Sequence, residues 1–156
     1  MIDAPFIEKQ IPGAMLRTLS RLSGYDILQS NEATSIDRSA KSWANVSALS
    51  FQTFKLIFDE YLESIPISSE LADSETRVAM IDCCVAFGRS HHDVNTSLTA
   101  TGMLWSLADR DSSSETLDIV LSNLASLSSD GRPELRNCSV NTLFSCVVGL
   151  GERFTE

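Results

Sequence analysis

Residues 117–147 read LDIVLSNLASLSSDGRPELRNCSVNTLFSCV, and this stretch decides the fold. Its first part carries apolar residues at the spacing i, i+3, i+4, i+7, namely Leu117, Val120, Leu121 and Leu124. Its last part repeats that spacing with Val140, Leu143, Phe144 and Val147. Residues that recur in this way share one face of an α-helix. Between the two runs, Pro133 suits a first helical turn and Glu134 lies favourably near the positive end of the helix dipole. The stretch therefore predicts a hairpin of two antiparallel helices.

The rest of the chain shows the same helical spacing, without the alternating pattern that is typical of strands. Further helices are expected over about 6–11, 14–28, 43–63, 73–89 and 93–108. Pro12 and Gly24 are expected to interrupt the first two, and Pro66 to end the third. Residues 30–42, SNEATSIDRSAKS, are polar and aperiodic and predict the longest loop. The sequence thus predicts a single all-α domain of about six helices over residues 1–156.

The helix expected over 43–63 is apolar around much of its circumference. Its main stripe contains Phe51, Phe54, Phe58, Tyr61, Leu62 and Ile65. Val46, Leu49, Leu56 and Ile57 widen this stripe, so we expect the helix to be covered on two sides. Such helices favour an α-solenoid of stacked antiparallel hairpins over a bundle. The chain is then expected to be a fragment of a longer protein, with apolar surface at both ends and weak self-association.

The charge of the chain bears on its partners. A net charge of -9, with only 12 Lys and Arg, opposes binding to nucleic acid or to anionic lipid. No stretch reaches the roughly 18 apolar residues of a membrane-spanning helix, and the acidic start does not fit a signal peptide. Four cysteines without metal-type C-x-x-C spacing indicate a reduced, cytoplasmic protein. We therefore expect no nucleic acid partner and no direct membrane insertion.

Candidate catalytic and metal-binding residues are few. His91 and His92 are the only histidines, and adjacent side chains on a helix do not converge on one metal. Asp93 is expected to cap a helix instead. The cysteines are expected to pack as small hydrophobic residues in helices, namely Cys83, Cys84, Cys138 and Cys146. No G-x-S-x-G motif or phosphate-binding glycine loop is present. We therefore predict no catalytic residue, no metal, no cofactor and no enzymatic activity.

Two further residues have an expected role. Trp43 stands at the start of a helix, where a large aromatic side chain either packs against that helix or serves as an exposed anchor for a partner. Gly102 lies inside the helix expected over 93–108 and is expected to permit the close approach of a neighbour.

The hairpin of residues 121–144 resembles a HEAT repeat. In that pattern an apolar helix is followed by an aspartate, a turn, an apolar-arginine pair and further apolar residues, here Asp130, Leu135, Arg136 and Leu143. The resemblance implies that Asp130, Arg132 and Arg136 have a structural role and bond across successive hairpins, because polar groups of a buried turn need partners.

Three segments taken in order resemble the MON-two family. They are WANVSALSFQTFKLIFDEYLESIP at 43–66, HHDVNTSLTATGMLWSLAD at 91–109 and DGRPELRNCSVNTLF at 130–144. This family comprises Golgi and endosomal scaffolds that are related to the large Arf guanine-nucleotide exchange factors. The resemblance implies an internal HEAT or armadillo-like domain of a cytoplasmic protein, peripheral on trans-Golgi and endosomal membranes. It also implies a role in vesicle-mediated transport linked to a lipid flippase, with a Dopey-type protein or neighbouring helical repeats as partners.

Two other functions stay open at this point. The kinship with exchange factors suggests a regulatory domain of an Arf guanine-nucleotide exchange factor, although no exchange domain with its catalytic glutamate is identifiable here. The HEAT pattern alone also fits another HEAT-repeat transport adaptor, since the repeat does not encode a destination.

Overall fold

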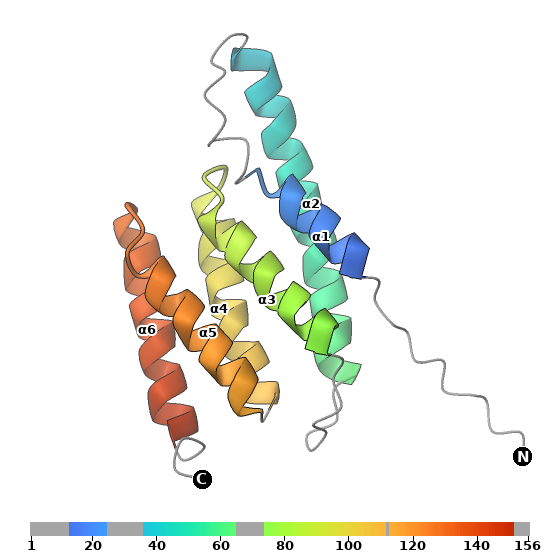
Figure 1. Ribbon diagram of the computed structural model, residues 1–156. Coiled ribbons are helices and arrows are strands. Elements are labelled where there is room, and N and C mark those ends of the chain that lie inside the picture. The colour runs from blue at the N-terminus through green and yellow to red at the C-terminus, as the bar shows by residue number, and fades with distance from the viewer. Residues whose placement is uncertain (1–12, 25–35, 65–73, 112, 152–156) are drawn as a thin grey trace, which may run out of the picture.

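The computed structural model describes residues 13–24, 36–64, 74–111 and 113–151 (Figure 1). All regular elements in these ranges are helices, which confirms the predicted all-α class. They are α1 (Gly13–Leu22), α2 (Ile36–Ser64), α3 (Ser74–Arg89), α4 (Val94–Arg110), α5 (Ser114–Leu127) and α6 (Pro133–Leu150). The helix expected over 6–11 and the end of the one expected over 14–28 lie outside the described residues.

The helices form two layers (Figure 1). One layer contains α1, α3 and α5, and the other contains α2, α4 and α6. Consecutive helices pair across the layers as α1 with α2, α3 with α4 and α5 with α6. Within each layer the neighbours α1 and α3, α3 and α5, α2 and α4, and α4 and α6 also touch. The helices α2 and α6 therefore lie at opposite ends of the same layer.

The aromatic stripe of α2 forms the core between α2 and α3. The ring of Phe87 on α3 lies 5.1 Å from that of Phe51 and 5.6 Å from that of Phe54. Phe54 and Phe58 also contact each other edge to face, at 5.9 Å. Burial of Phe51, Phe54, Phe58 and Tyr61 confirms the predicted stripe. Ile65 lies outside the described residues.

Among the described residues, the expected second cover of α2 is absent over Leu49 and Leu56, which are 65% and 73% exposed. That part of the prediction is wrong. The helix lies at the end of its layer, so among the described residues only its inward side meets other helices. Apolar spacing shows which residues share a face, but it does not show whether a neighbour covers that face.

The helix α2 also begins earlier than predicted. Residues 36–42 are helical, although they belong to the segment 30–42 that was predicted to be a loop; residues 30–35 lie outside the described part. The helical residues include Arg38, Ala40 and Lys41, which have high helix propensity, and no Gly or Pro interrupts them. A lack of apolar periodicity therefore did not mean a lack of helix here.

Helix ends follow the expected chemistry. Asp93 caps α4, because its Oδ2 accepts a hydrogen bond of 2.8 Å from the backbone N–H of Thr96. That bond and one from the Thr96 hydroxyl lower the pKa of Asp93. Helix α1 ends before Gly24, whose φ of 78° lies in the left-handed region that favours glycine. The Ser23 carbonyl just before it accepts hydrogen bonds from Ser47 of α2 and Ser90 at the end of α3. The three elements are thus tied together at one point.

The expectation for Gly102 is wrong. No neighbouring helix or side chain of the described part lies within 4 Å of a methyl group placed on it. Close approach occurs instead at Gly149 of α6, where such a methyl group would lie 2.7 Å from the Trp105 ring. Glycine inside a helix was visible in the sequence at both positions, but only the packing of α4 against α6 shows which one is in contact.

Candidate interaction surface

The cysteines lie between helices. The Cys83 thiol donates a hydrogen bond of 2.9 Å to the carbonyl of Leu16, which joins α3 to α1. Burial raises the pKa of Cys83 to about 12 and that of Cys146 to about 11, and it also raises that of Cys84. Cys138 is half-buried and lies 3.7 Å from the Leu98 carbonyl. A nucleophilic cysteine needs a lowered pKa, so the three buried thiols are suited to packing and not to attack on a substrate.

The two histidines and Asp93 point to different surroundings. His91 is exposed, while His92 is half-buried, and within the described part of the chain its Nε2 is enclosed without a hydrogen-bond partner. Desolvation, followed by the nearby His91, lowers the pKa of His92. The Asp93 carboxylate is engaged as the α4 cap. Within the described residues, no three side chains of metal-binding type lie close enough to hold an ion together.

Trp43 lies against the end of α1. Its indole nitrogen is enclosed, and a methyl group on Gly24 would come within 2.6 Å of that nitrogen and closer still to Nε2 of His92. The side chain therefore packs between α1, α2 and the turn before α4. Of the two roles expected for Trp43, this placement favours packing over an exposed partner anchor.

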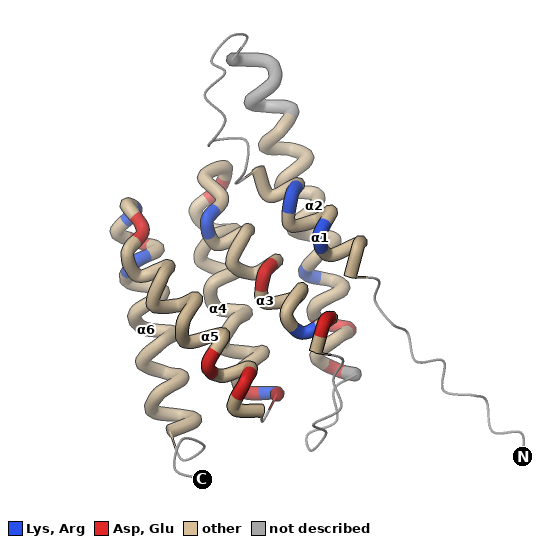
Figure 2. The backbone as a smooth tube through the Cα atoms, in the orientation of Figure 1, with Lys and Arg blue, Asp and Glu red and all other residues tan. Residues whose placement is uncertain are grey.

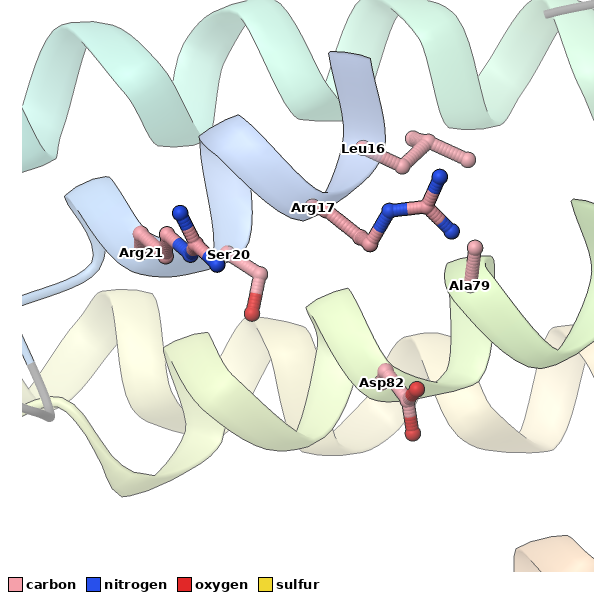
Figure 3. A pocket seen from close by; sticks show the side chains of 6 residues that line it. All are labelled: Leu16, Arg17, Ser20, Arg21, Ala79 and Asp82. Carbon is pink, nitrogen blue, oxygen red and sulfur yellow. The ribbon is translucent and has the colours of Figure 1, made fainter. Parts of the chain in front are cut away.

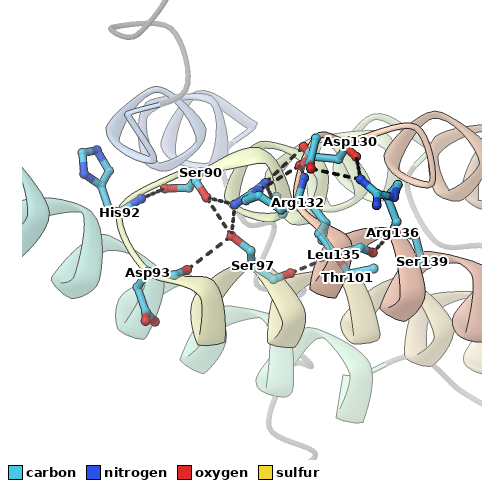
Figure 4. A network of polar contacts seen from close by, with 12 residues as sticks. Ser90, His92, Asp93, Ser97, Thr101, Asp130, Arg132, Leu135, Arg136 and Ser139 are labelled. Carbon is cyan, nitrogen blue, oxygen red and sulfur yellow. Dashed lines mark hydrogen bonds and ion pairs between the residues drawn. The ribbon is translucent and has the colours of Figure 1, made fainter.

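Asp130 and Arg132 form a bonded pair that joins the last hairpin to α3; we call it the Arg132 latch (Figure 4). The Arg132 guanidinium donates to the carbonyls of Gly88 and Ser90, at 3.0 and 2.6 Å, and to the Ser97 hydroxyl at 3.1 Å. Asp130 accepts from Nε of Arg132 at 2.9 Å. The hydrogen bond from Arg132 lowers the pKa of Asp130 more than burial raises it. Arg132 thereby pairs carbonyls at the end of α3 that have no helical partner.

Among the residues that the structure describes, Arg136 makes no bond across hairpins. Its Nη1 donates to the carbonyls of Asp130 and Gly131, at 3.1 and 2.9 Å, both in its own turn (Figure 4). Long side chains on a helix point back toward its N-terminus, so Arg136 reaches the turn just before α6. The role expected for Asp130 and Arg132 fits the observed bonds, whereas the role expected for Arg136 is corrected.

A second charged cluster, at the other end of α3, was missed; it consists of Arg77, Asp111 and Glu115, and we call it the Arg77 latch. Arg77 is only 5% exposed, and its guanidinium lies 3.1 Å from carboxylate oxygens of Asp111 and of Glu115. Burial alone would raise the pKa of Asp111, but bonds from Thr116 and Ser113 together with the Arg77 charge bring it below its ordinary value. In the sequence, only the polar turn after α4 could have indicated the carboxylates that contact Arg77.

The outer side of α1 and α3 carries a shallow hollow of about 220 Å³ (Figure 3). It is lined by Leu16, Arg17, Ser20, Arg21, Ala79 and Asp82. Partial burial raises the pKa of Asp82, and Arg17 forms an exposed ion pair with Glu75 beside the hollow. The volume is below that of typical ligand sites, and the lining offers no nucleophile next to a base. This hollow has the character of an ordinary groove between two helices.

The surface that stands out lies on α6. We call Val140, Phe144, Val147 and Val148 the α6 face; they are 52%, 67%, 44% and 67% exposed. No charged residue occurs from 137 to 151, and α6 carries charge only near its start (Figure 2). The spacing placed Val140, Phe144 and Val147 on one face, and that face is exposed among the described residues because α4 and α5 cover the opposite side of the helix. The exposed apolar surface on α6 confirms, for this end, the prediction of apolar surface at both ends.

Comparisons with known proteins add no family: no protein-family model, no curated protein and no solved structure was found to match this chain. The resemblance to the MON-two family thus stays a prediction that rests on the three segments quoted for it. Among the helices that the structure describes, none has both the length and the apolar composition needed to cross a membrane.

Proposed function

We propose that this chain is a non-catalytic protein-interaction module, built as an α-solenoid of stacked antiparallel hairpins of the HEAT or armadillo kind. The observation that carries the proposal is the α6 face, with four exposed apolar side chains in a stretch without charge. Large exposed apolar patches are uncommon on monomeric proteins and mark surfaces that other proteins cover. The α6 face is therefore the proposed contact surface.

The order of contacts supports the solenoid. Each helix pair packs on the next one in sequence, and α2 and α6 close opposite ends of one layer. In a solenoid each unit contacts only its neighbours, so an end unit has a face without cover. Among the described helices, α6 is the last in its layer, and its outer face has no such neighbour.

The use of polar groups supports a non-catalytic role. The Arg77 and Arg132 latches bind helix ends and turns, and their carboxylates already accept hydrogen bonds from these arginines or from the capped turn. The thiols of Cys83, Cys84 and Cys146 have raised pKa values. The buried arginines, their carboxylate partners and the buried thiols thus serve to hold helices together.

The resemblance to the MON-two family adds a cellular role to the proposal. It suggests a scaffold in vesicle-mediated trafficking, peripheral on trans-Golgi or endosomal membranes, with a Dopey-type protein as partner. A capture experiment tests this: the purified chain is immobilised and presented with a Dopey-type protein. We expect binding that Phe144→Glu abolishes and Leu56→Glu leaves intact, since Leu56 is equally exposed but lies among charged residues. Absence of binding to the unchanged chain would remove the trafficking part of the proposal.

The two other functions predict different results. As a regulatory domain of an Arf exchange factor, the chain would alter nucleotide release from an Arf-type GTPase. As another HEAT-repeat transport adaptor, it would bind a cargo or transport receptor in place of the Dopey-type protein. A nucleotide-release assay, run beside the capture experiment, separates these outcomes. Release accelerated by the chain alone would overturn the non-catalytic assignment.

A further inference from the structure

The α6 face has the spacing of a helix–helix seam. Val140, Phe144, Val147 and Val148 stand at i, i+4, i+7 and i+8, so they line one side of the helix for more than two turns. The inward side of the same helix is separately apolar and buried, through Leu135, Cys146 and Leu150. Helix α6 therefore carries two apolar sides, and the described part of the chain covers one.

The α6 face points away from α4. Contacts with α4 are marked by Cys138, beside the Leu98 carbonyl, and by Gly149, beside Trp105. With 3.6 residues per turn, Phe144 lies roughly 120–140° around α6 from both positions. An incoming helix on Phe144 would thus continue the layer in which α2, α4 and α6 already pack side by side.

Charge decides which occupant fits. The chain has a net charge of -9, so most contacts between two copies would bring like charges together. The α6 face escapes this cost because residues 137–151 carry no charge. A charged partner would gain no ion pair there and would lose the hydration of its own charges.

Contact with other exposed apolar residues of a second copy fits less well. Leu49 and Leu56 on α2 share their helix surface with Lys55, Asp59 and Glu60, all exposed. Packing α6 onto α2 of a second copy would bury those charges against apolar side chains. Among the described surfaces, the one that matches the α6 face in charge and in apolar spacing is the α6 face itself.

We propose that the α6 face is an isologous interface between two copies of this chain. The two α6 helices pack antiparallel across a two-fold axis near Phe144, so that Val140 of each copy meets the partner subunit's Val148. The proposal rests on the proposed function as an interaction module, and it makes a second copy the occupant of the α6 face, in competition with a Dopey-type protein for the same residues. A contact of this symmetry closes after two copies and leaves no α6 face open for a filament.

Sedimentation velocity from micromolar to near-millimolar concentration tests the proposal. We expect an equilibrium of monomer and dimer that does not grow further. Phe144→Glu should weaken it on the order of a hundredfold, because it places two like charges beside the axis in an apolar contact. Leu56→Glu should leave it unchanged, and matching circular dichroism and melting curves would show that both variants fold.

A charge-pairing experiment tests the antiparallel geometry. V140K and V148E should each weaken the dimer, and the double variant should recover most of the loss, because each introduced lysine then faces the introduced glutamate of the other copy. Within one helix the two positions are more than two turns apart and do not pair. Parallel packing would bring like charges together and give no recovery.

Three results would overturn the proposal: a monomer at all concentrations, growth beyond the dimer, or equal weakening by Phe144→Glu and Leu56→Glu. The proposed function has a separate readout. A monomeric chain that still captures a Dopey-type protein through Phe144 would remove the second copy as occupant and keep the interaction module.

Discussion

The helices α2 and α6 end the same layer, yet they meet solvent in different ways. On α2 the exposed Leu49 and Leu56 stand two turns apart, and Leu56 lies beside Lys55 and Asp59, which form an exposed ion pair of 3.4 Å. On α6 four exposed apolar residues are contiguous and uncharged. Single exposed apolar residues are normal on proteins, whereas contiguous ones signal an interface. The α2 end therefore has the character of a free surface and the α6 end that of a contact surface.

The two sides of α6 give the sharpest test of this difference. Leu135 is fully buried on the inward side, so Leu135→Asp should cost about 4 kcal/mol or more through lost packing and a buried charge. Phe144→Asp on the outer side should change the free energy of unfolding by less than about 1 kcal/mol. Urea unfolding at low protein concentration measures both. Similar losses would mean that the α6 face is covered within the single chain.

The Arg132 latch holds the α6 end to α3. Arg132→Met should cost about 2–3 kcal/mol, because it removes the guanidinium bonds to Asp130 and to the carbonyls of Gly88 and Ser90. Asp130 keeps its bond from the backbone N–H of residue 132, and the Ser90 carbonyl keeps its bond from the Ser97 hydroxyl. The control is Arg136→Met, since Arg136 bonds only within its own turn and should cost about 1 kcal/mol or less. The difference in urea midpoint between these variants measures the contact across hairpins. A larger loss for Arg136→Met would contradict the assignment.

At the α2 end, Gly24 packs against Trp43 and His92. Gly24→Ala should cost about 1–2 kcal/mol, because alanine disfavours the positive φ and its methyl group would meet both rings. Gly102→Ala is the matched control, as this position is helical and has free space, and it should stabilise by up to about 1 kcal/mol. Thermal melting of the two variants measures whether each substitution lowers or raises the stability. Equal effects would show that Gly24 is not held as described.

The smallest expected effect is a pH dependence at the α2 end. The pKa of His92 is lowered in the folded chain, so the unfolded chain binds the proton more readily. Stability should be complete above the ordinary value of 6.5 and should fall as the pH drops through it toward the lower folded value. The free energy of unfolding, measured across this pH window, should decrease as the pH falls. His92→Gln should remove this pH dependence. A slope that persists in His92→Gln would assign it to another group.

Much of the fold could be predicted because helix start signals and apolar spacing are local. The beginning of α3 at Ser74, the Asp93 cap and the turn before Pro133 all follow from residues within one helical turn. The start of α2 at Ile36 was missed, since its first residues have helix propensity without an apolar face.

The contact surface could be predicted only in part. Spacing placed Val140, Phe144 and Val147 on one face, but their exposure depends on where α4 and α5 pack. The Arg77 latch joins residues 34 and 38 positions apart, and no local pattern marks such a pair. Arg132 was identified through the resemblance to a repeat, whereas its carbonyl partners on α3 were not.

The Cys83 thiol, which is bonded to the Leu16 carbonyl, is a natural probe of local opening between α1 and α3. A maleimide or similar reagent needs the thiolate, and burial of Cys83 and Cys146 suppresses that form. Labelling of Cys83 then requires α1 to separate from α3, while labelling of Cys146 requires α6 to lift from its neighbours. The labelling rate of each thiol, followed by mass spectrometry, would report how often each helix contact opens. No cysteine would have to be introduced.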